Sequence, residues 1–498
     1  MIIYIYGHEF NYELEKLTRL FFPFERIDFK TNNSIETRNG LFALASVYKV
    51  DEDFEINAAA GLGDKIIEKN QSFSEAEVIS GIVEKELEHS LAALLFDCYA
   101  ELTGYKPQWG ILTGIRPAKL YRRFEEMLGE KGADSYFTGK FRVNDKKLSL
   151  LKRTAKSEEE IISRSGRGSV SIYISIPFCP SRCSYCSFVS HSIERAADLI
   201  PEYLRLLCKE IEYTADIVKR LGLSVMTVYV GGGTPTTLSA EQLNTLLDTV
   251  HNCFGNEFDE LTVEAGRPDT ITKEKLLVLK NSGVDRISIN PQTMNDNVLK
   301  AIGRRHTAKQ TVDTFNLARE IGFSNINMDL IAGLPTDTSD SFADTLEMVI
   351  ALEPESVTVH SLSIKRSSAI KDNSASLMFE EGKMAGEMVD LAEERLSEKG
   401  ILPYYMYRQS KTVGNLENVG YAKPGSEGLY NVYIMDETHT ILACGASAVS
   451  KLKAEDDGKI ERIFNFKYPY EYINKFDEIM KRKERIESFY YEHPISNK

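Results

Sequence analysis

No apolar run in the sequence is long enough to cross a bilayer, so no membrane span is predicted. The opening residues, MIIYIYGHEFNYELEKL, lack the basic segment of a secretory signal peptide, and Glu9 comes early. Basic residues are in deficit, because 60 Lys and Arg stand against 74 Asp and Glu, a net charge of −14. Phosphate neutralisation needs basic surface, so this composition disfavours a nucleic-acid-binding function. We therefore expect a cytoplasmic protein without a nucleic-acid partner.

Cysteine is scarce, and its distribution excludes a disulfide framework, since the seven residues are an odd number and most are isolated. The isolated residues, expected to be small buried side chains, are Cys98, Cys208, Cys253 and Cys444. The other three, Cys179, Cys183 and Cys186, lie together in the stretch ISIPFCPSRCSYCSF. In a reducing compartment, such a group indicates metal binding or chemistry.

The chain length suggests about three domains. Residues 1–156 open with a strand-like run and an amphipathic helix near 12–21, and they predict an extra N-terminal α+β domain. The charged stretch 156–169 contains Gly and Ser and is interpreted as a linker. Residues 169–370 then form the core domain. Residues 371–498 form a smaller C-terminal α+β domain, with a helix followed by two strand-like runs, LYNVYIM and HTILAC.

Short β-branched runs alternate with long helical patterns in the core domain. In one such helix Leu199, Tyr203, Leu207 and Ile211 recur on a single face. Alternation repeated six times argues for a parallel sheet, either open and doubly wound or closed into a partial barrel. The expected strands cover 171–176, 226–230, 260–265, 285–290, 325–331 and 356–362. In both arrangements, reactive groups belong at the C-terminal ends of the strands.

The three clustered cysteines follow the first of these strands, where an active site is expected. Thiolates suit zinc or iron–sulfur clusters. A structural zinc site needs four protein ligands, and His191 and Cys208 do not provide a usual zinc spacing. Three ligands on a [4Fe–4S] cluster instead leave one iron open to a small molecule. A zinc site with a distant fourth ligand stays as the alternative.

Further polar and glycine-rich motifs follow later strands. VGGGTPTTL places Gly232, Gly233 and Thr234 at the end of the second strand, where glycine lets the backbone approach a ligand closely and adopt positive φ. Glu264 ends the third strand. Three other polar residues of later strand ends or loops complete a predicted ring on one face: Gln292, Arg304 and Asp329.

Taken in order, these motifs resemble the radical S-adenosylmethionine (SAM) superfamily, and within it the oxygen-independent coproporphyrinogen III oxidases. The resemblance rests on SIYISIPFCPSRCSYCSF, VGGGTPTTL, VEAGRPDT, RISINPQTMNDNVLKAIGRRHT and NINMDLIAGLPTDTSDSF. NLENVGYAKPGSEGLYNV, CGASAVS and the N-terminal motif WGILTGIRPAKL (109–120) resemble the long branch of that family. The fold implied is a partial (β/α)6 barrel with an extra N-terminal domain and a smaller C-terminal domain.

The resemblance also implies the cofactors and the residues that hold them. Cys179, Cys183 and Cys186 would bind a [4Fe–4S] cluster whose open iron chelates SAM, and Tyr173 belongs to the same catalytic set. The matching SAM-contacting positions are Tyr173, Tyr185, Gly232, Gly233, Thr234, Glu264, Gln292, Arg304 and Asp329. The activity implied is oxidative decarboxylation of two propionates of coproporphyrinogen III to vinyl groups. A low-potential electron donor such as flavodoxin or ferredoxin is the expected partner.

Two departures from the oxidase pattern keep other functions open. Ser175 replaces the usual His, and Phe188 stands where the oxidases often have a fourth cysteine. The second departure resembles a related haem-trafficking branch. The alternatives are therefore a haem chaperone that retains the cluster, and a radical SAM methyltransferase or ring-opening enzyme acting on haem.

A substrate with four carboxylates requires cations near the open iron. Lys365 and Arg366 follow the sixth strand, and Arg408 lies in the C-terminal region. Because guanidinium matches carboxylates bidentately, we expect the two arginines to bind propionates, with Lys365 in support. Trp109, Arg116 and Lys119 of the N-terminal motif are interpreted as packing residues or as a contact surface.

Overall fold

A computed structural model describes residues 1–36, 40–51, 53–74, 86–186, 191–363, 375–409, 412–456 and 458–495. The chain divides into two compact units. Unit 1 combines Met1–Ala155 with the short segments Asp372–Gly386 and Tyr407–Glu417. Unit 2 contains the remainder, Lys156–Lys371, Glu387–Met406 and Asn418–Lys498.

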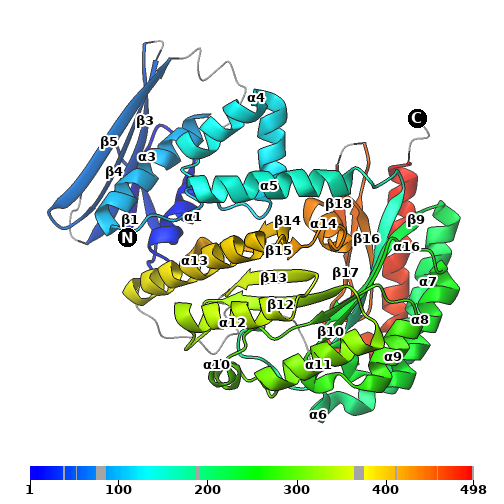
Figure 1. Cartoon of the computed structure of the whole chain (residues 1–498). Helices are drawn as coiled ribbons and strands as arrows, with labels where there is room; N and C mark the ends of the chain where they lie inside the picture. Colours follow the sequence, from blue (N-terminus) through cyan, green and yellow to red (C-terminus); the bar gives the residue numbers. More distant parts are fainter. Residues whose placement is uncertain are drawn as a thin grey trace. The chain divides into compact units, whose positions relative to one another are not determined.

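Unit 1 is built on a five-stranded mixed sheet covered by helices (Figure 1). The strand order is β2-β1-β3-β4-β5, with β1 parallel to both neighbours and the β3–β4–β5 meander antiparallel. The strands are β1 (Ile2–Tyr6), β2 (Asp28–Thr31), β3 (Leu41–Val50), β4 (Asp53–Leu62) and β5 (Lys65–Ser74). The helices are α1 (Asn11–Phe21), α3 (Glu86–Thr103), α4 (Pro117–Gly139) and α5 (Asp145–Ile162). Apolar residues of α1, α3 and the strands share one core.

The predicted strand β1 and helix α1 are confirmed, whereas the predicted linker at 156–169 is wrong in its first half. Residues 156–162 continue α5 because Glu158–Glu160 and the apolar Ile161 suit a helix, and Ile161 is buried. The motif at 109–120 also packs inward. The Trp109 side chain is fully buried, and its indole N–H donates to Glu417 Oε2 at 2.6 Å. That carboxylate also pairs with Lys147 at 2.5 Å.

Unit 2 contains one long sheet whose centre is parallel, as the six strand–helix repeats predict. The strand order is β14-β15-β13-β12-β11-β10-β9-β6-β16-β17-β18. The six predicted strands are confirmed as β6 (Ser169–Ile176), β9 (Ser224–Gly232), β10 (Glu260–Gly266), β11 (Arg286–Ile289), β12 (Ile326–Ala332) and β13 (Ser356–Ser361). Each pairs in parallel with its neighbour in chain order. The order is open at both edges, as in the predicted partial barrel.

Helices connect successive parallel strands and lie along the outer side of this sheet (Figure 1). They are α7 (Ile200–Leu221), α8 (Ala240–Phe254), α9 (Lys273–Asn281), α10 (Asp296–Ala301), α11 (Ala308–Ile321) and α12 (Ser339–Ala351). In α7 the predicted face is buried at Tyr203, Leu207 and Ile211. Gly222 ends this helix in a left-handed conformation with φ of 64°.

The C-terminal residues extend the sheet at both of its edges. After α13 (Ala375–Glu398), strand β15 (Glu417–Ala422) pairs antiparallel with β13, with β14 (Leu402–Arg408) outside it. On the opposite edge, β16 (Thr440–Cys444) adds in parallel to β6, followed by β17 (Val449–Lys453) and β18 (Ile460–Phe464). The remaining helices are α14 (Leu429–Asp436), α15 (Pro469–Asn474) and α16 (Phe476–Glu492).

The prediction that LYNVYIM forms a strand is wrong, because this run is helix α14. Its residues are apolar on nearly all sides, so their pattern cannot distinguish a buried helix from a buried strand. The prediction that HTILAC forms a strand is confirmed by β16. Over the described ranges, none of the helices has the length and apolar character that crossing a bilayer requires.

Candidate active site

The three-cysteine loop leaves the C-terminal end of β6. Its first cysteine, Cys179, lies in the short strand β7 (Phe178–Cys179), which pairs with β8 (His191–Ser192). Cys183 is 8% exposed, and Cys179 and Cys186 are half-buried. All three are free thiols. Phe188, one of the two departures from the oxidase pattern, lies outside the described residues.

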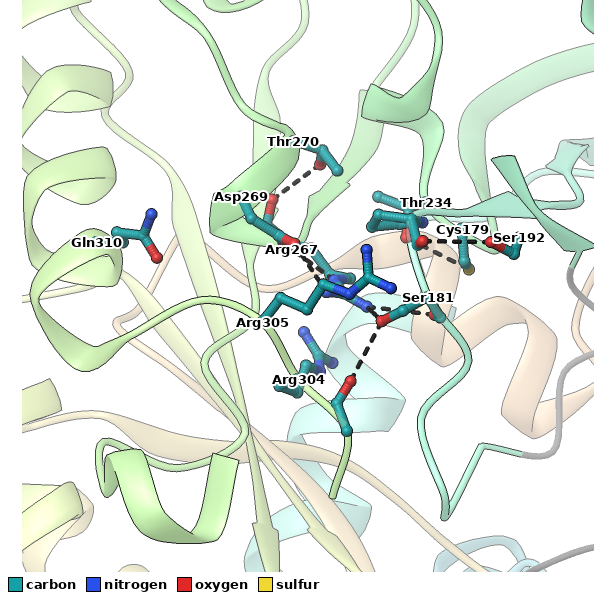
Figure 2. A network of polar contacts seen from close by, with 12 residues as sticks. Cys179, Ser181, Ser192, Thr234, Arg267, Asp269, Thr270, Arg304, Arg305 and Gln310 are labelled. Carbon is teal, nitrogen blue, oxygen red and sulfur yellow. Dashed lines mark hydrogen bonds and ion pairs between the residues drawn. The ribbon is translucent and has the colours of Figure 1, made fainter. Parts of the chain in front are cut away.

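The loop is fastened from the ends of neighbouring strands. Arg267, which follows β10, donates to the carbonyl oxygen of Ser181 at 3.2 Å and to its hydroxyl at 2.7 Å, while pairing with Asp269 at 2.8 Å (Figure 2). On the other side, the amide of Ser184 donates to the carbonyl oxygen of Ile302 at 3.1 Å. Arg267 was not among the residues predicted from the sequence, although its place in VEAGRPDT, at a strand end, is a usable signal.

The glycine motif packs directly against the cysteine loop. The amides of Gly233 and Thr234 donate to the carbonyl oxygens of Ile176 and Phe178 at 2.7 and 2.8 Å. The Thr234 hydroxyl lies 3.5 Å from the sulfur of Cys179. A Cβ added at Gly233 would meet Phe178 O at 2.6 Å and that sulfur at 3.0 Å. Glycine is therefore required here for close approach.

The predicted positive φ is confirmed at Gly232, where φ is 106°. Gly233 does not have a positive φ. A Cβ at Gly232 would also approach the Ser175 hydroxyl oxygen to 2.9 Å. Ser175, which replaces the family's usual His, therefore lies directly beneath this glycine. The two glycines are thus needed for different reasons, one for its backbone conformation and the other for the space around it.

The arrangement of the thiols bears on the choice between zinc and a cluster. In the described parts of the chain, no three His, Cys, Asp or Glu side chains are grouped closely enough to hold one metal ion. Thiolates on a single zinc lie about 3.8 Å apart, because each Zn–S bond is about 2.3 Å long. In a [4Fe–4S] cluster each thiolate binds a different iron, which requires wider spacing. The described residues therefore do not present a preformed site for a single metal ion.

Inside the barrel, Glu264 projects from the end of β10. Burial raises the pKa of this carboxyl to about 7, although a 2.6 Å hydrogen bond from the Tyr229 hydroxyl opposes the shift. The nearby charge of Asp329 raises the pKa further. A carboxylate held this way gains strongly from a bound cation, such as the ammonium of an amino acid.

Asp329 on β12 is the second inward-facing carboxylate. Burial alone would raise its pKa, but the neighbouring imidazole of His360 and a 2.7 Å hydrogen bond from the Asn327 amide lower it below the ordinary value. The imidazole Nε2 of His360 lies 3.8 Å from Asp329 Oδ2. The interior therefore contains Glu264, whose pKa is about 7, and Asp329, whose lowered pKa keeps it ionised.

Gln292 and Arg304 occupy the loops that follow β11. Gln292 has a φ of 70°, which is strained for a residue other than glycine, and it is held by backbone hydrogen bonds to Asp329 and Ile331 at 2.9 and 3.0 Å. Arg304 donates to the Tyr185 hydroxyl at 2.8 Å and to the Asn290 carbonyl oxygen at 3.2 Å. Tyr185 belongs to the cysteine loop, so Arg304 links that loop to β11.

Three tyrosine rings lie nearly parallel in the interior. The ring centroids of Tyr229 and Tyr430 are 4.5 Å apart, and Tyr173 lies 6.3 and 6.2 Å from them, all within 23° of parallel. Tyr173 was predicted from the sequence as a site residue, whereas Tyr229 and Tyr430 were not. Alternation along β9 could have identified Tyr229 as facing inward, whereas Tyr430 reaches the site only through tertiary folding of α14.

Of the predicted substrate cations, the structure describes only Arg408. Lys365 and Arg366 lie outside the described residues. Arg408 is 2% exposed in unit 1, where it donates to the carbonyl oxygens of Leu112 and Asn415. Its guanidinium also lies 5.2 Å from the centre of the Trp109 ring. The prediction that Arg408 binds propionates is therefore wrong, because burial and these partners make it a packing residue.

The chain is similar to known proteins over most of its length. The Radical SAM superfamily model matches residues 173–349, which cover the cysteine loop, the glycine motif and both carboxylates. An "Oxygen-independent coproporphyrinogen-III oxidase-like protein HemZ" from Bacillus subtilis is 38% identical over 433 residues, 85% of this chain and 86% of that protein. The chain belongs to this radical SAM family. The predicted resemblance to the long branch of this family, which has an extra N-terminal domain, is confirmed.

Other similar proteins are named haem chaperones. The "Heme chaperone HemW" of Bacillus subtilis is 34% identical over 55% of this chain and 70% of that protein. The Escherichia coli protein of the same name is 28% identical over 60% of this chain. Among solved structures, the Escherichia coli coproporphyrinogen III oxidase HemN aligns over 64% of this chain and 71% of that chain, with a TM-score of 0.48 and 24% identity.

Membership of the radical SAM family fixes the cofactors as a [4Fe–4S] cluster and SAM. The local chemistry fits both groups. Three clustered thiols would leave one iron open, and Gly233, which has no room for a Cβ, lies directly beside Cys179. The chain is therefore a radical SAM protein of the porphyrin and haem group.

Proposed function

We propose that this protein catalyses the oxygen-independent oxidative decarboxylation of coproporphyrinogen III to protoporphyrinogen IX. One observation carries the proposal: the cysteine loop and the glycine motif follow the C-terminal ends of β6 and β9, and the Glu264 and Asp329 carboxylates of β10 and β12 interact in the same interior. That is where α/β enzymes build their active sites. Similarity to the oxidase-like HemZ over most of the chain supports the choice of reaction.

In this proposal Cys179, Cys183 and Cys186 hold the cluster. The SAM-binding set is Tyr173, Tyr185, Gly232, Gly233, Thr234, Glu264, Gln292, Arg304 and Asp329. When bound, the two cofactors supply a 5′-deoxyadenosyl radical that can remove a hydrogen atom from an unactivated carbon. The Glu264 carboxylate would accept hydrogen bonds from the SAM ammonium, and Tyr229 orients that carboxylate through its 2.6 Å hydrogen bond.

The proposed reaction begins at the propionate β-carbon. Removal of one hydrogen atom from the propionate β-carbon leaves a carbon radical. Breaking the bond to the carboxylate carbon then releases CO2 and one electron to a one-electron acceptor, and the vinyl group remains. Lys365 and Arg366 are the proposed cations for the other propionates, because guanidinium and ammonium groups pair with carboxylates.

Haem handling without decarboxylation is the second candidate function. Two observations favour it: several relatives are named haem chaperones, and Phe188 replaces the fourth cysteine often found in the oxidases. The cluster and the SAM pocket would be retained under this alternative. The barrel would then hold haem for delivery.

An anaerobic assay separates these functions. Reconstituted protein is incubated with SAM, a reductant and coproporphyrinogen III, and the products are separated by chromatography. Protoporphyrinogen IX, detected as protoporphyrin after oxidation, supports the proposal, and a Cys183→Ala variant is the matched control. Unchanged coproporphyrinogen together with tight haem binding supports the chaperone function. A methylated or opened haem product identifies the third alternative.

A further inference from the structure

An exposed aromatic pair lies beside the cysteine loop. Tyr468 and Tyr470 are 36% and 46% exposed, and their rings stack with centroids 5.5 Å apart and planes at 10°. The ring of His191 packs edge-on against both, at 5.8 and 6.3 Å. Large apolar side chains that cluster on a surface mark interaction sites, and tyrosine is enriched in protein–protein interfaces.

This pair is structurally continuous with the proposed cluster ligands. His191 and Ser192 form β8, whose backbone pairs with Phe178 and Cys179 in β7. The Ser192 hydroxyl also donates to the carbonyl oxygen of Pro180 at 3.4 Å. The tyrosine pair is therefore separated from the strand that carries Cys179 by a single side chain, His191. Figure 2 shows Ser192 close to Cys179.

The same surface carries positive charge on an otherwise acidic protein. Arg182, inside the cysteine loop, is exposed, and its guanidinium has no hydrogen bond or ion pair to any described residue. Lys467, which precedes Tyr468, is exposed and likewise has no such partner within the described ranges. Burial lowers the pKa of His191, and Arg182 adds to the shift, so the imidazole is neutral near pH 7. The local charge comes from the two long cations.

We propose that Tyr468, Tyr470, Arg182 and Lys467 form the docking surface for an acidic, low-potential one-electron carrier protein. A [4Fe–4S] cluster that cleaves SAM must receive an electron from outside the chain, and this surface packs against the β7–β8 pair that contains Cys179. Electron-transfer encounters use small interfaces, in which a few aromatic contacts and complementary charge determine the rate. A patch with two unpaired cations on a protein of net charge −14 selects a carrier with an acidic rim. The inference rests on the radical SAM cofactors, and it does not depend on which tetrapyrrole is the substrate.

The test uses the full-length, cluster-loaded protein and reduced flavodoxin as the probe. The variants are Tyr468→Ser with Tyr470→Ser, and Arg182→Gln. Matched controls elsewhere in unit 2 are Tyr491→Ser, whose side chain is 75% exposed, and Lys481→Gln on an exposed position of α16. Two quantities are measured: the Kd for flavodoxin at low and high salt, and the rate of cluster bleaching in stopped flow. Dithionite serves as a small reductant that needs no docking site.

We expect both site variants to weaken flavodoxin binding and to slow reduction by flavodoxin by about tenfold or more, with dithionite reduction unchanged. The Arg182→Gln variant should also lose part of the salt dependence, since one charge pair is removed. If Arg182→Gln assembles less iron, the tyrosine double variant, which lies outside the cluster loop, decides the question. Flavodoxin binding and reduction equal to the wild type in that variant would overturn the proposal. No porphyrinogen is present, so this result is independent of the decarboxylation assay.

Discussion

The hydroxyl of Tyr229 donates a 2.6 Å hydrogen bond to Oε1 of Glu264. The two residues belong to adjacent parallel strands, β9 and β10. Their contact stabilises the charged carboxylate, while burial opposes it and leaves the Glu264 pKa near 7. The charge of this carboxyl is therefore set by pH in the range where the protein would bind SAM.

The first prediction concerns SAM binding and pH. The raised pKa of about 7 means that Glu264 is increasingly protonated below neutral pH, and a neutral carboxyl cannot pair with the SAM ammonium. SAM affinity should therefore fall by up to about tenfold for each pH unit below 7. Equilibrium dialysis with the reconstituted protein measures this dependence. Over the roughly 1.5 pH units from pH 7 down to pH 5.5, the SAM affinity should fall clearly. A constant affinity over this range would exclude Glu264 from SAM binding.

Tyr229→Phe tests the positioning role of the tyrosine. The variant removes the hydrogen bond that favours the carboxylate, so the Glu264 pKa should rise further. The loss of SAM affinity should then begin at a higher pH than in the wild type. Glu264→Gln is the reference, because its affinity should be weak and independent of pH. An unshifted pH profile in Tyr229→Phe would assign the tyrosine to packing alone.

The second prediction concerns the glycine motif. In Gly233→Ala the new Cβ would meet Phe178 O at 2.6 Å and the Cys179 sulfur at 3.0 Å, so β7 must move. We expect reduced iron content and loss of SAM binding in a folded protein. Gly114→Ala is the matched control, because no atom lies within 4 Å of its Cβ and its φ is ordinary. Iron content and SAM affinity equal to the wild type in Gly233→Ala would show that this loop does not hold the cofactors.

The third prediction separates the clustered cysteines from the others. Alanine at Cys179, Cys183 or Cys186 should abolish the site-differentiated cluster and with it SAM cleavage. Burial raises the pKa of Cys98 and of Cys444, to about 12 and about 11, so these thiols stay protonated and inert. Their alanine variants should keep full iron and sulfide content. Zinc in place of iron in anaerobically purified wild-type protein would contradict the assignment.

The fourth prediction concerns a buried ion pair behind the active site. Lys483 lies 3.1 Å from Glu210, and both side chains are at most 1% exposed. Glu210 also accepts hydrogen bonds from Tyr472 at 2.6 Å and from the Gly445 amide at 2.8 Å. Lys483→Met would leave a buried carboxylate unpaired, which should lower the free energy of unfolding by about 3–5 kcal/mol.

Urea denaturation followed by circular dichroism measures the effect of Lys483→Met. The control is Lys309→Met, which removes an ion pair to Asp313 between side chains that are 83% and 58% exposed. Loss of that exposed pair should change the free energy of unfolding by about 0.5 kcal/mol or less. Equal effects of the two variants would show that the Glu210 network contributes no special stability to unit 2.

Local sequence patterns predicted the parallel sheet because strand and helix signals act over a few residues. The β-branched runs and the face formed by Tyr203, Leu207 and Ile211 each fixed one element. The same locality explains the errors. LYNVYIM is apolar on nearly all sides, so its local pattern does not distinguish a strand from the observed helix α14, and packing decides between them. The charged start of the expected linker, 156–162, belongs to α5.

The cofactors could also be predicted from the sequence, because the spacing of the three thiols and the order of the later motifs resemble those of radical SAM proteins. Tertiary structure decided which side chains meet. Tyr430 joins Tyr173 and Tyr229 only because α14 folds over the barrel, and Arg267 reaches Ser181 across 86 residues of chain. Tertiary structure also buries Arg408, whereas a propionate-binding arginine must be accessible to the substrate. The physical reason is that a side chain's local sequence fixes its chemistry, whereas its burial and partners depend on contacts between residues far apart in the chain.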